Sequence, residues 1–230
     1  MTTHNYFARW STDLYGSGIE FQRTIHVLTA GIVRGDTLDL GCGSRVHYYT
    51  ANAQRWVGMD LSQAMLDDLR FFGQPPRQPP EKIAASCFEP PFEDQSFDTV
   101  CAMFLLHHLG QYSARCSRRR VVQVLATAHR LLRPGGRLLI AESARRALEL
   151  PYHAVFPALY RIFRLADIEL PYFWTLRQLL AMSRTAGFDD SLVAQIPIRE
   201  RIVNPVSGIA LPPLITNLLQ HMTLIVLTKH

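Results

Sequence analysis

Two glycines and a later aspartate are the first residues whose types and spacing suggest chemistry. Gly41 and Gly43 directly follow the apolar run at residues 37–40, and Asp60 ends the apolar run at 56–60. Glycine lets the backbone turn sharply and lets a ligand approach it, and the start of a following helix would present free N–H groups to an anion. The two oxygens of a carboxylate match the two hydroxyls of a ribose. Together these features predict a ligand that contains adenosine and leave its identity open.

Two adjacent histidines, His107 and His108, offer a different chemistry. They belong to the stretch FLLHHL at residues 104–109, directly after the apolar run at 97–103. Imidazole titrates close to neutral pH, so either side chain could act as a general base; the alternative for both is a packing or helix-start role. Neighbouring side chains on one element point apart, and no acidic or cysteine partner stands at ligand spacing, so we expect no metal site.

The elements that must position these residues alternate along the chain. Short runs rich in Val, Ile and Leu predict strands, and helix-like stretches or loops separate them. The predicted strands are residues 37–40, 56–60, 82–86, 97–103 and 137–143. This β-α-β repetition predicts a parallel sheet, which binds ligands at the carboxyl ends of its strands, where the glycines, Asp60 and the histidines all fall.

Length, charge and cysteines narrow the classes of protein that remain. With 230 residues, 48% of them hydrophobic, the chain can bury one substantial core. The net charge of +5 comes mainly from scattered arginines, and RCSRRR at 115–120 has the pattern of a solvated helix face, so we expect no nucleic-acid partner. The N-terminus lacks the order of a signal peptide, and no apolar run is long enough to span a membrane. With four cysteines at unpaired spacing, these features predict a cytoplasmic protein without membrane contact.

Four further motifs follow one another in a fixed order. They are Asp39 before the glycines, FEPPFEDQSFDTV at 88–100, LLRPGGRLLI at 131–140 and AGF at 186–188. In this order and spacing the chain resembles the class I S-adenosylmethionine-dependent methyltransferases. The resemblance implies an α/β, Rossmann-like fold with a seven-stranded, mostly parallel sheet whose last strand is antiparallel.

The resemblance also implies where the cofactor S-adenosylmethionine, and its product S-adenosylhomocysteine, would bind. In the family the glycine loop lies against the methionyl moiety, the acidic residue after the second strand holds the ribose, and the region before the Pro-Phe pair lines the adenine slot. The cofactor positions carried over to this chain are Asp39, Gly41, Cys42, Gly43, Asp60, Leu61, Ser86, Cys87, Phe88, Met103 and Phe104.

Two positions depart from the family's pattern. Ser86 stands where an acidic residue often accepts a hydrogen bond from the adenine amine, so adenine would depend on serine, backbone and stacking. Arg45 stands where a third glycine is frequent, and the helix expected between Gly43 and the next strand is about one turn shorter than usual. A dinucleotide dehydrogenase shares the ribose carboxylate, but it requires the third glycine and explains neither FEDQSFD nor RPGG.

We expect the whole chain, 1–230, to form a single methyltransferase domain. Residues 1–30 would form an N-terminal helical cap, 31–145 the cofactor-binding core, 146–175 a cap insertion after the fifth strand, and 176–230 the rest of the sheet. The pattern at 121–132 predicts a helix that RPGG at 133–136 ends, and the insertion has helical spacing that Pro157 interrupts.

Aromatic side chains gather in the two cap segments and predict a lid over a flat, hydrophobic substrate. The alternative is that these side chains pack against one another as the core of a cap. The candidate substrate-binding residues are Tyr6, Trp10, Tyr15, Tyr152, Phe156 and Tyr160.

These expectations favour methyl transfer to a hydrophobic, aromatic or polyketide-like small molecule of secondary metabolism. Because His108 or His107 could remove a proton, an oxygen acceptor is favoured over nitrogen or carbon. Two alternatives remain: a methyltransferase-like cyclase, and a noncatalytic partner that keeps the fold. The sequence leaves the oligomeric state open.

Overall fold

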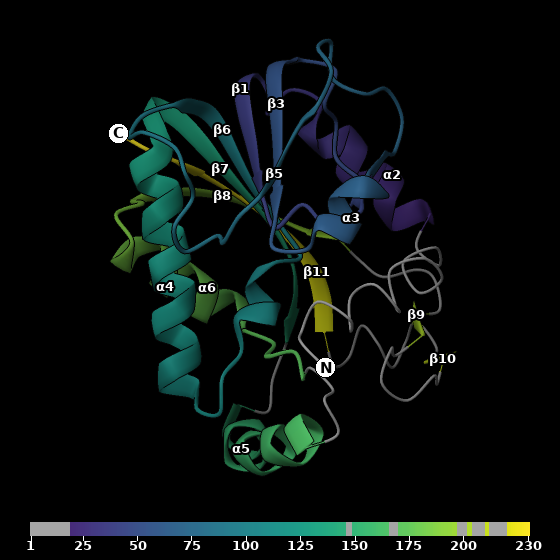
Figure 1. Cartoon of the computed structure of the whole chain (residues 1–230). Helices are drawn as coiled ribbons and strands as arrows, with labels where there is room; N and C mark the ends of the chain where they lie inside the picture. Colours follow the sequence, from purple (N-terminus) through teal and green to yellow (C-terminus); the bar gives the residue numbers. More distant parts are fainter. Residues whose placement is uncertain (1–18, 146–148, 166–169, 197–201, 204–209, 212–219) are drawn as a thin grey trace.

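A seven-stranded sheet forms the centre of the molecule (Figure 1). The computed structural model describes residues 19–145, 149–165, 170–196, 202–203, 210–211 and 220–230. The strands are ordered β5-β3-β1-β6-β7-β11-β8. Their bounds are β1 Gly35–Leu40, β3 Ala53–Asp60, β5 Glu81–Ala84, β6 Phe97–Met103, β7 Leu132–Arg145, β8 Asp190–Ile196 and β11 Gln220–Thr228.

The directions of the strands confirm the predicted topology. The pairs β5 with β3, β3 with β1, β1 with β6 and β6 with β7 are parallel, whereas β11 runs antiparallel to both β7 and β8. All five strands predicted from apolar runs are present, although β5 ends two residues before its predicted end. The sheet is therefore mostly parallel, and the last strand in the chain is the antiparallel one.

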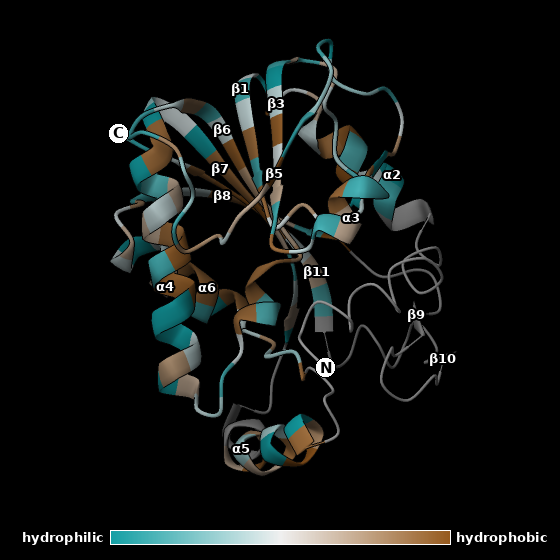
Figure 2. Cartoon of the chain, viewed as in Figure 1, coloured by the Kyte–Doolittle hydropathy of each residue, from teal (hydrophilic) through white to brown (hydrophobic). Residues whose placement is uncertain are grey.

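Side chains that alternate along the strands supply two apolar clusters, one on each face. Leu38 and Leu40 of β1 pack in the cluster that also contains buried residues of α4 (Ala114–Leu131) and α6 (Leu176–Thr185). The cluster on the other face contains Ile25 of α2 (Ile19–Thr29) and Leu66 of α3 (Gln63–Asp67). Figure 2 shows the hydrophobic residues concentrated in the strands, with hydrophilic residues on the outer side of α4. The strand ends that carry the predicted site lie between the two layers of helices.

The segment between β1 and β3 differs from the prediction. Residues 41–52 contain no helix; instead, the short strand β2 (Arg45–Val46) pairs with β4 (Arg70–Phe71). The expectation of a shortened helix here is therefore wrong, and with it the expected set of free helix N–H groups. The segment is held by side chains instead, because the buried Tyr48 hydroxyl donates to Asp39 Oδ2 over 2.9 Å and accepts from Trp56 Nε1 over 2.7 Å.

The turn RPGG also lies differently from the prediction. The helix α4 ends at Leu131, and β7 begins at the next residue, so the turn belongs to the start of the strand. Gly135 has a φ of 75°, and its N–H donates to the Lys229 carbonyl over 2.8 Å. These contacts tie the turn to the end of the chain.

The cap insertion contains one long helix, α5 (Glu149–Leu165), which continues through Pro157. Two short strands, β9 (Ile202–Val203) and β10 (Ala210–Leu211), follow β8 in the chain. The candidates Tyr6, Trp10 and Tyr15 lie outside the described residues.

Candidate active site

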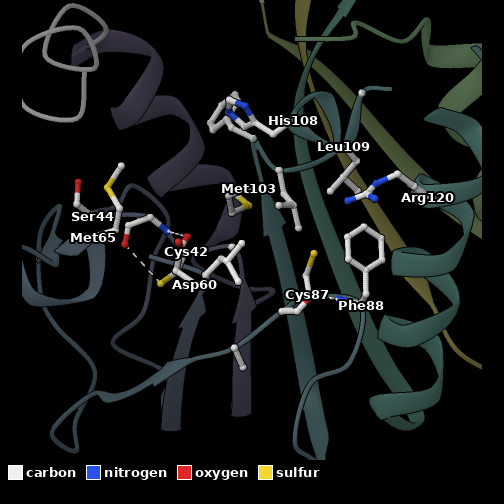
Figure 3. A pocket seen from close by; sticks show the side chains of 18 of the residues that line it. Cys42, Ser44, Asp60, Met65, Cys87, Phe88, Met103, His108, Leu109 and Arg120 are labelled. Carbon is white, nitrogen blue, oxygen red and sulfur yellow. Dashed lines mark hydrogen bonds between the residues drawn. The ribbon is translucent and has the colours of Figure 1, made fainter. Parts of the chain in front are cut away.

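A pocket of about 420 Å³ opens at the carboxyl ends of β1, β3 and β6 (Figure 3). It is the place at which the parallel sheet was expected to bind a ligand. Ten of the predicted cofactor positions line it: Gly41, Cys42, Gly43, Asp60, Leu61, Ser86, Cys87, Phe88, Met103 and Phe104. The sheet therefore brings together residues that are far apart in the sequence.

The glycine loop forms one wall of the pocket. Gly41 and Gly43 have φ angles of 67° and 59°, a region that side chains other than glycine rarely adopt. The N–H groups of Gly41 and Cys42 both donate to the carbonyl of Met59, which ties the loop to β3. A Cβ atom at Gly43 would meet nothing within 4 Å, whereas one at Gly41 would lie 2.6 Å from Leu105. The backbone at Gly43 is thus open to a ligand in the pocket.

Asp60 is fixed at the end of β3 by two backbone donors. Its Oδ2 accepts from the N–H of Gly43 over 3.0 Å, and its Oδ1 accepts from the N–H of Ser62 over 2.8 Å. Each carboxylate oxygen can accept more than one hydrogen bond, so both remain able to accept from a ligand. Figure 3 shows the carboxylate at the edge of the pocket beside Cys42. This geometry suits the two hydroxyls of a ribose.

Across the pocket from Asp60 lies a second group of residues, from Ser86 to Phe88. The Phe88 N–H donates to Ser86 Oγ over 3.3 Å, which shapes the turn after β5. Burial raises the pKa of the Cys87 thiol to about 11, so this side chain is neutral. The Arg120 guanidinium lies 4.3 Å from the centroid of the Phe88 ring. This end of the pocket offers flat, mostly apolar surfaces.

Asp39 does not line the pocket. Its carboxyl is fully buried behind the glycine loop, where it accepts from the Tyr48 hydroxyl and where Oδ1 has no hydrogen-bond partner among the described residues. Burial is the main cause that raises the pKa of Asp39 to about 8, and the nearby charge of Asp60 acts in the same direction. The structure therefore places Asp39 where it can shape the loop that faces the ligand.

The two histidines differ in their surroundings. His108 lines the pocket, and Figure 3 shows it above Met103 and Leu109. His107 does not line the pocket, because its Nδ1 lies 2.8 Å from Glu142 Oε2 and its ring stacks on Phe173. The rings of the two histidines are 4.0 Å apart. Of the two, His108 is in the position to touch a ligand.

The cap contributes to the pocket from α5. Tyr160 lines the pocket, whereas Phe156 is buried in the core, 4.6 Å from the ring of Tyr172. Tyr152 lies in α5, but its side chain is outside what the structure describes. The position of Tyr160 is therefore that expected for a lid, whereas Phe156 packs in the core.

Several lining residues were missed by the sequence analysis. Arg120 belongs to the cluster RCSRRR, which was interpreted as a solvated helix face; Arg118 and Arg119 are exposed, but Arg120 faces the pocket. The signal was present in the sequence, because Arg120 follows Ser117 and precedes Val124 at helical spacing on the buried side of α4. The other missed lining residues include Leu105, Leu109, Gln111, Arg164 and Leu170.

Comparison with protein-family models adds a decisive observation. Residues 38–140, which carry the glycine loop, Asp60 and both histidines, match the family described as "Methyltransferase domain". This match and the topology of the sheet support a class I S-adenosylmethionine-dependent methyltransferase domain in this part of the chain. The matched residues run from β1 to the middle of β7. The resemblance found in the motifs is thereby confirmed.

Two curated relatives match parts of the methyltransferase domain. A protein of Encephalitozoon cuniculi named as a methyltransferase is 33% identical over 103 residues, which are 45% of this chain and 42% of that protein. The mRNA cap guanine-N(7) methyltransferase 1 of Oryza sativa subsp. japonica is 31% identical over 116 residues, 43% of this chain and 30% of that protein. The match therefore spans less than half of either relative.

Solved structures with 16 to 17% sequence identity share the fold along most of the chain. A methyltransferase of Thermotoga maritima has a TM-score of 0.55 and covers 98% of this chain and 99% of its own. The phosphoethanolamine N-methyltransferase 2 of Haemonchus contortus, solved with S-adenosylhomocysteine, has a TM-score of 0.61 and covers 99% and 58%. The cyclase SpnF also has a TM-score of 0.61 and covers 96% and 85%. These likenesses confirm the Rossmann-like fold.

The residues of the pocket fit S-adenosylmethionine. The open space beside Gly43 admits a ligand against the backbone, the fixed carboxylate of Asp60 can accept from a ribose, and Leu61, Cys87 and Phe88 offer apolar surface for a purine. Within the described residues, no helix is long and apolar enough to cross a membrane.

Proposed function

We propose that the protein transfers a methyl group from S-adenosylmethionine to a small hydrophobic molecule. The observation that carries this proposal is that Asp60 and His108 line the same pocket, together with apolar residues of three different elements. The predicted cofactor site and the candidate base therefore face the same pocket. The matched methyltransferase domain and the solved complex with S-adenosylhomocysteine support the choice of cofactor.

When bound, the cofactor supplies a sulfonium-activated methyl group for in-line displacement. The chain's own contribution is to fix geometry: the glycine loop and Asp60 orient the cofactor, and Leu105 and Leu109 exclude water from the pocket. Positioning of this kind supplies most of the acceleration in a displacement in which the positive charge of the sulfonium is lost and the leaving group departs as a neutral thioether. His108, which lines the pocket, would accept the proton of an acceptor hydroxyl.

The lining residues support a hydrophobic acceptor. Leu105, Leu109 and Leu170 face the pocket, and Tyr160 adds an aromatic surface from the cap. The pocket volume of about 420 Å³ must hold the cofactor and the acceptor together, which limits the size of the acceptor. We infer an aromatic or polyketide-like compound, methylated on oxygen in preference to nitrogen or carbon because of the available base.

A two-step experiment tests the proposal. Calorimetry first measures binding of S-adenosylhomocysteine to the purified protein, and labelled S-adenosylmethionine is then offered with phenols, enols, amines and a capped RNA oligonucleotide. Methyl transfer to a phenol or enol is the expected result. Transfer to the RNA alone would contradict the proposal; this arm is included because one relative is an mRNA cap methyltransferase.

The cyclase remains the second candidate function, because SpnF shares the fold along most of the chain. The same two steps distinguish it from the first. Binding of S-adenosylhomocysteine without transfer to any member of the panel favours a cyclase-like use of the cofactor. Absence of binding favours a noncatalytic partner, and the enzyme assignment would then be wrong.

A further inference from the structure

Arg120 places a half-buried guanidinium at the end of the pocket opposite Asp60. Its guanidinium lies 4.3 Å from the centroid of the Phe88 ring, which it covers in a cation-π contact. Its Nε is buried, and the described residues offer it no hydrogen-bond partner. Figure 3 shows Arg120 reaching from α4 toward Phe88, with Cys87 beside them. A guanidinium can donate but cannot accept, so the terminal N–H groups of Arg120, which line the pocket, can donate to an acceptor on a ligand.

The position of Arg120 assigns it to the nucleobase end of the cofactor site. Figure 3 shows Cys87 beside Phe88 and Arg120, and the positive charge of Arg120 opposes the effect of burial on the pKa of the Cys87 thiol. The resemblance places adenine at the segment that includes Ser86, Cys87 and Phe88. Arg120 therefore faces the edge of the adenine slot.

This end of the pocket lacks the acid that the family often uses. Of the described residues that line the pocket, Asp60 is the only acidic one, and it lies at the opposite end. Ser86 stands at the position of the acid, and its Oγ already accepts from the Phe88 N–H. The slot is thus rich in donors, which suits the ring nitrogens of adenine better than its exocyclic amine.

We propose that Arg120 recognises adenine by donating a terminal guanidinium N–H to a ring nitrogen, while Phe88 holds the guanidinium in place. The inference rests on the proposed function and adds a specificity-determining residue to it. A hydrogen bond from a charged donor to a buried acceptor is stronger than one between neutral groups, so its loss should be measurable. Recognition would then depend on a ring nitrogen in place of the amine.

Calorimetry with S-adenosylhomocysteine and its 1-deaza, 3-deaza and 7-deaza analogues tests this proposal. Each analogue replaces one ring nitrogen by a C–H group, so the wild type should bind one of the three about tenfold more weakly than the parent compound. Arg120→Met should bind the parent about tenfold more weakly and should no longer distinguish it from that analogue. Arg119→Met is the matched control, because Arg119 is exposed on the same helix, and it should behave as the wild type.

Three outcomes would overturn the inference. The wild type could bind all three analogues equally well, or Arg120→Met could bind S-adenosylhomocysteine as the wild type does. In the third outcome, Arg120→Met leaves cofactor binding unchanged and raises the KM of an acidic acceptor, which would show that the guanidinium binds the acceptor. Failure of the wild type to bind S-adenosylhomocysteine at all would instead show that the proposed function is wrong. Equal binding of all three analogues by the wild type overturns the inference without any variant, so the inference can be contradicted even if Arg120→Met folds poorly.

Discussion

Glu142 Oε2 lies 2.8 Å from His107 Nδ1, and both side chains are almost completely shielded from solvent. The other oxygen of Glu142 accepts from the N–H of Leu106 over 2.6 Å. One carboxylate at the end of β7 thus holds the 3₁₀ helix η2 (Leu106–Leu109), which carries His108 into the pocket. Glu142 and His107 position the candidate base and do not themselves line the pocket.

Glu142→Ala should destabilise the protein, because it leaves two buried donors without an acceptor. We expect a loss of roughly 2 to 4 kcal/mol in the free energy of unfolding, measured by urea denaturation. Glu142→Gln should lose less, because its oxygen can accept from Leu106 and its amide can donate to the other tautomer of His107. Glu81→Ala is the control, since its ion pair with Arg55 is exposed. Equal losses of unfolding free energy in Glu142→Ala and Glu81→Ala would show that the buried contacts of Glu142 stabilise the protein no more than an exposed ion pair does.

His108→Ala should slow methyl transfer while leaving the affinity for S-adenosylhomocysteine nearly unchanged. A general base is worth about 100-fold or more in rate, so kcat should fall by that order for an oxygen acceptor. Single-turnover transfer and calorimetry measure the two quantities separately. His129→Ala serves as control, because His129 packs on Phe188, away from the pocket. Equal turnover of His108→Ala and wild type would remove His108 from the mechanism.

Asp60→Ala should weaken the binding of S-adenosylhomocysteine by roughly 2 kcal/mol or more, because a charge-assisted pair of hydrogen bonds to the ribose is lost. Asp67→Ala removes an exposed carboxylate from α3 and should bind the cofactor as the wild type does. Thermal unfolding of both variants separates lost binding from a loosened glycine loop, since Asp60 also accepts from Gly43. Unchanged affinity in a folded Asp60→Ala protein would contradict the ribose assignment.

The parts of the fold that depend on local pattern could be predicted from the sequence. The predicted strands β1, β3, β5, β6 and β7 contain short apolar runs, and the position of Asp60 at the end of β3 follows from the end of such a run. Because parallel strands bring their carboxyl ends to one edge, the gathering of Gly41, Asp60 and Met103 at one pocket followed as well.

The parts that depend on tertiary contacts could not be predicted in this way. No local pattern shows that residues 41–52 lack a helix and are held by the hydrogen bonds of Tyr48 instead. The partners of Tyr48, Asp39 and Trp56, are brought to it by the sheet. For Arg120 the helical spacing from Ser117 and Val124 indicates only the buried side of α4. Its contact with Phe88, which lies on another element, is made by the tertiary fold and has no signal in the sequence.

Gly43→Ala should weaken cofactor binding without a large loss of stability. The added methyl group would enter the open space beside the loop, and the φ of 59° strains any side chain at this position by roughly 1 to 2 kcal/mol. Gly135→Ala is a matched control, because its φ of 75° imposes a similar strain in open space outside the pocket. Both variants should unfold at similar urea concentrations, but only Gly43→Ala should bind S-adenosylhomocysteine more weakly. Equal affinities would show that the ligand does not approach the loop.

Asp39 makes stability depend on pH in a predictable direction. Burial raises its pKa from 3.8 to about 8, so the folded protein keeps a proton that the unfolded chain releases. The stabilisation from this proton is fully present below pH 3.8 and is lost as the pH rises to about 8. Within this window Asp39 should lower the free energy of unfolding by roughly 1.4 kcal/mol for each pH unit.

Asp39→Asn removes this titration while keeping an oxygen that accepts from Tyr48. Urea denaturation at several pH values between the two pKa values should therefore show a smaller decline of stability with rising pH than in the wild type. Asp67→Asn replaces an exposed carboxylate and should leave the slope unchanged. The comparison depends on the difference between slopes, because the other titrating groups contribute equally to all three proteins. A slope in Asp39→Asn as steep as that of the wild type would mean that Asp39 is already ionised in the folded state, and the buried carboxyl would then need a cation beside it.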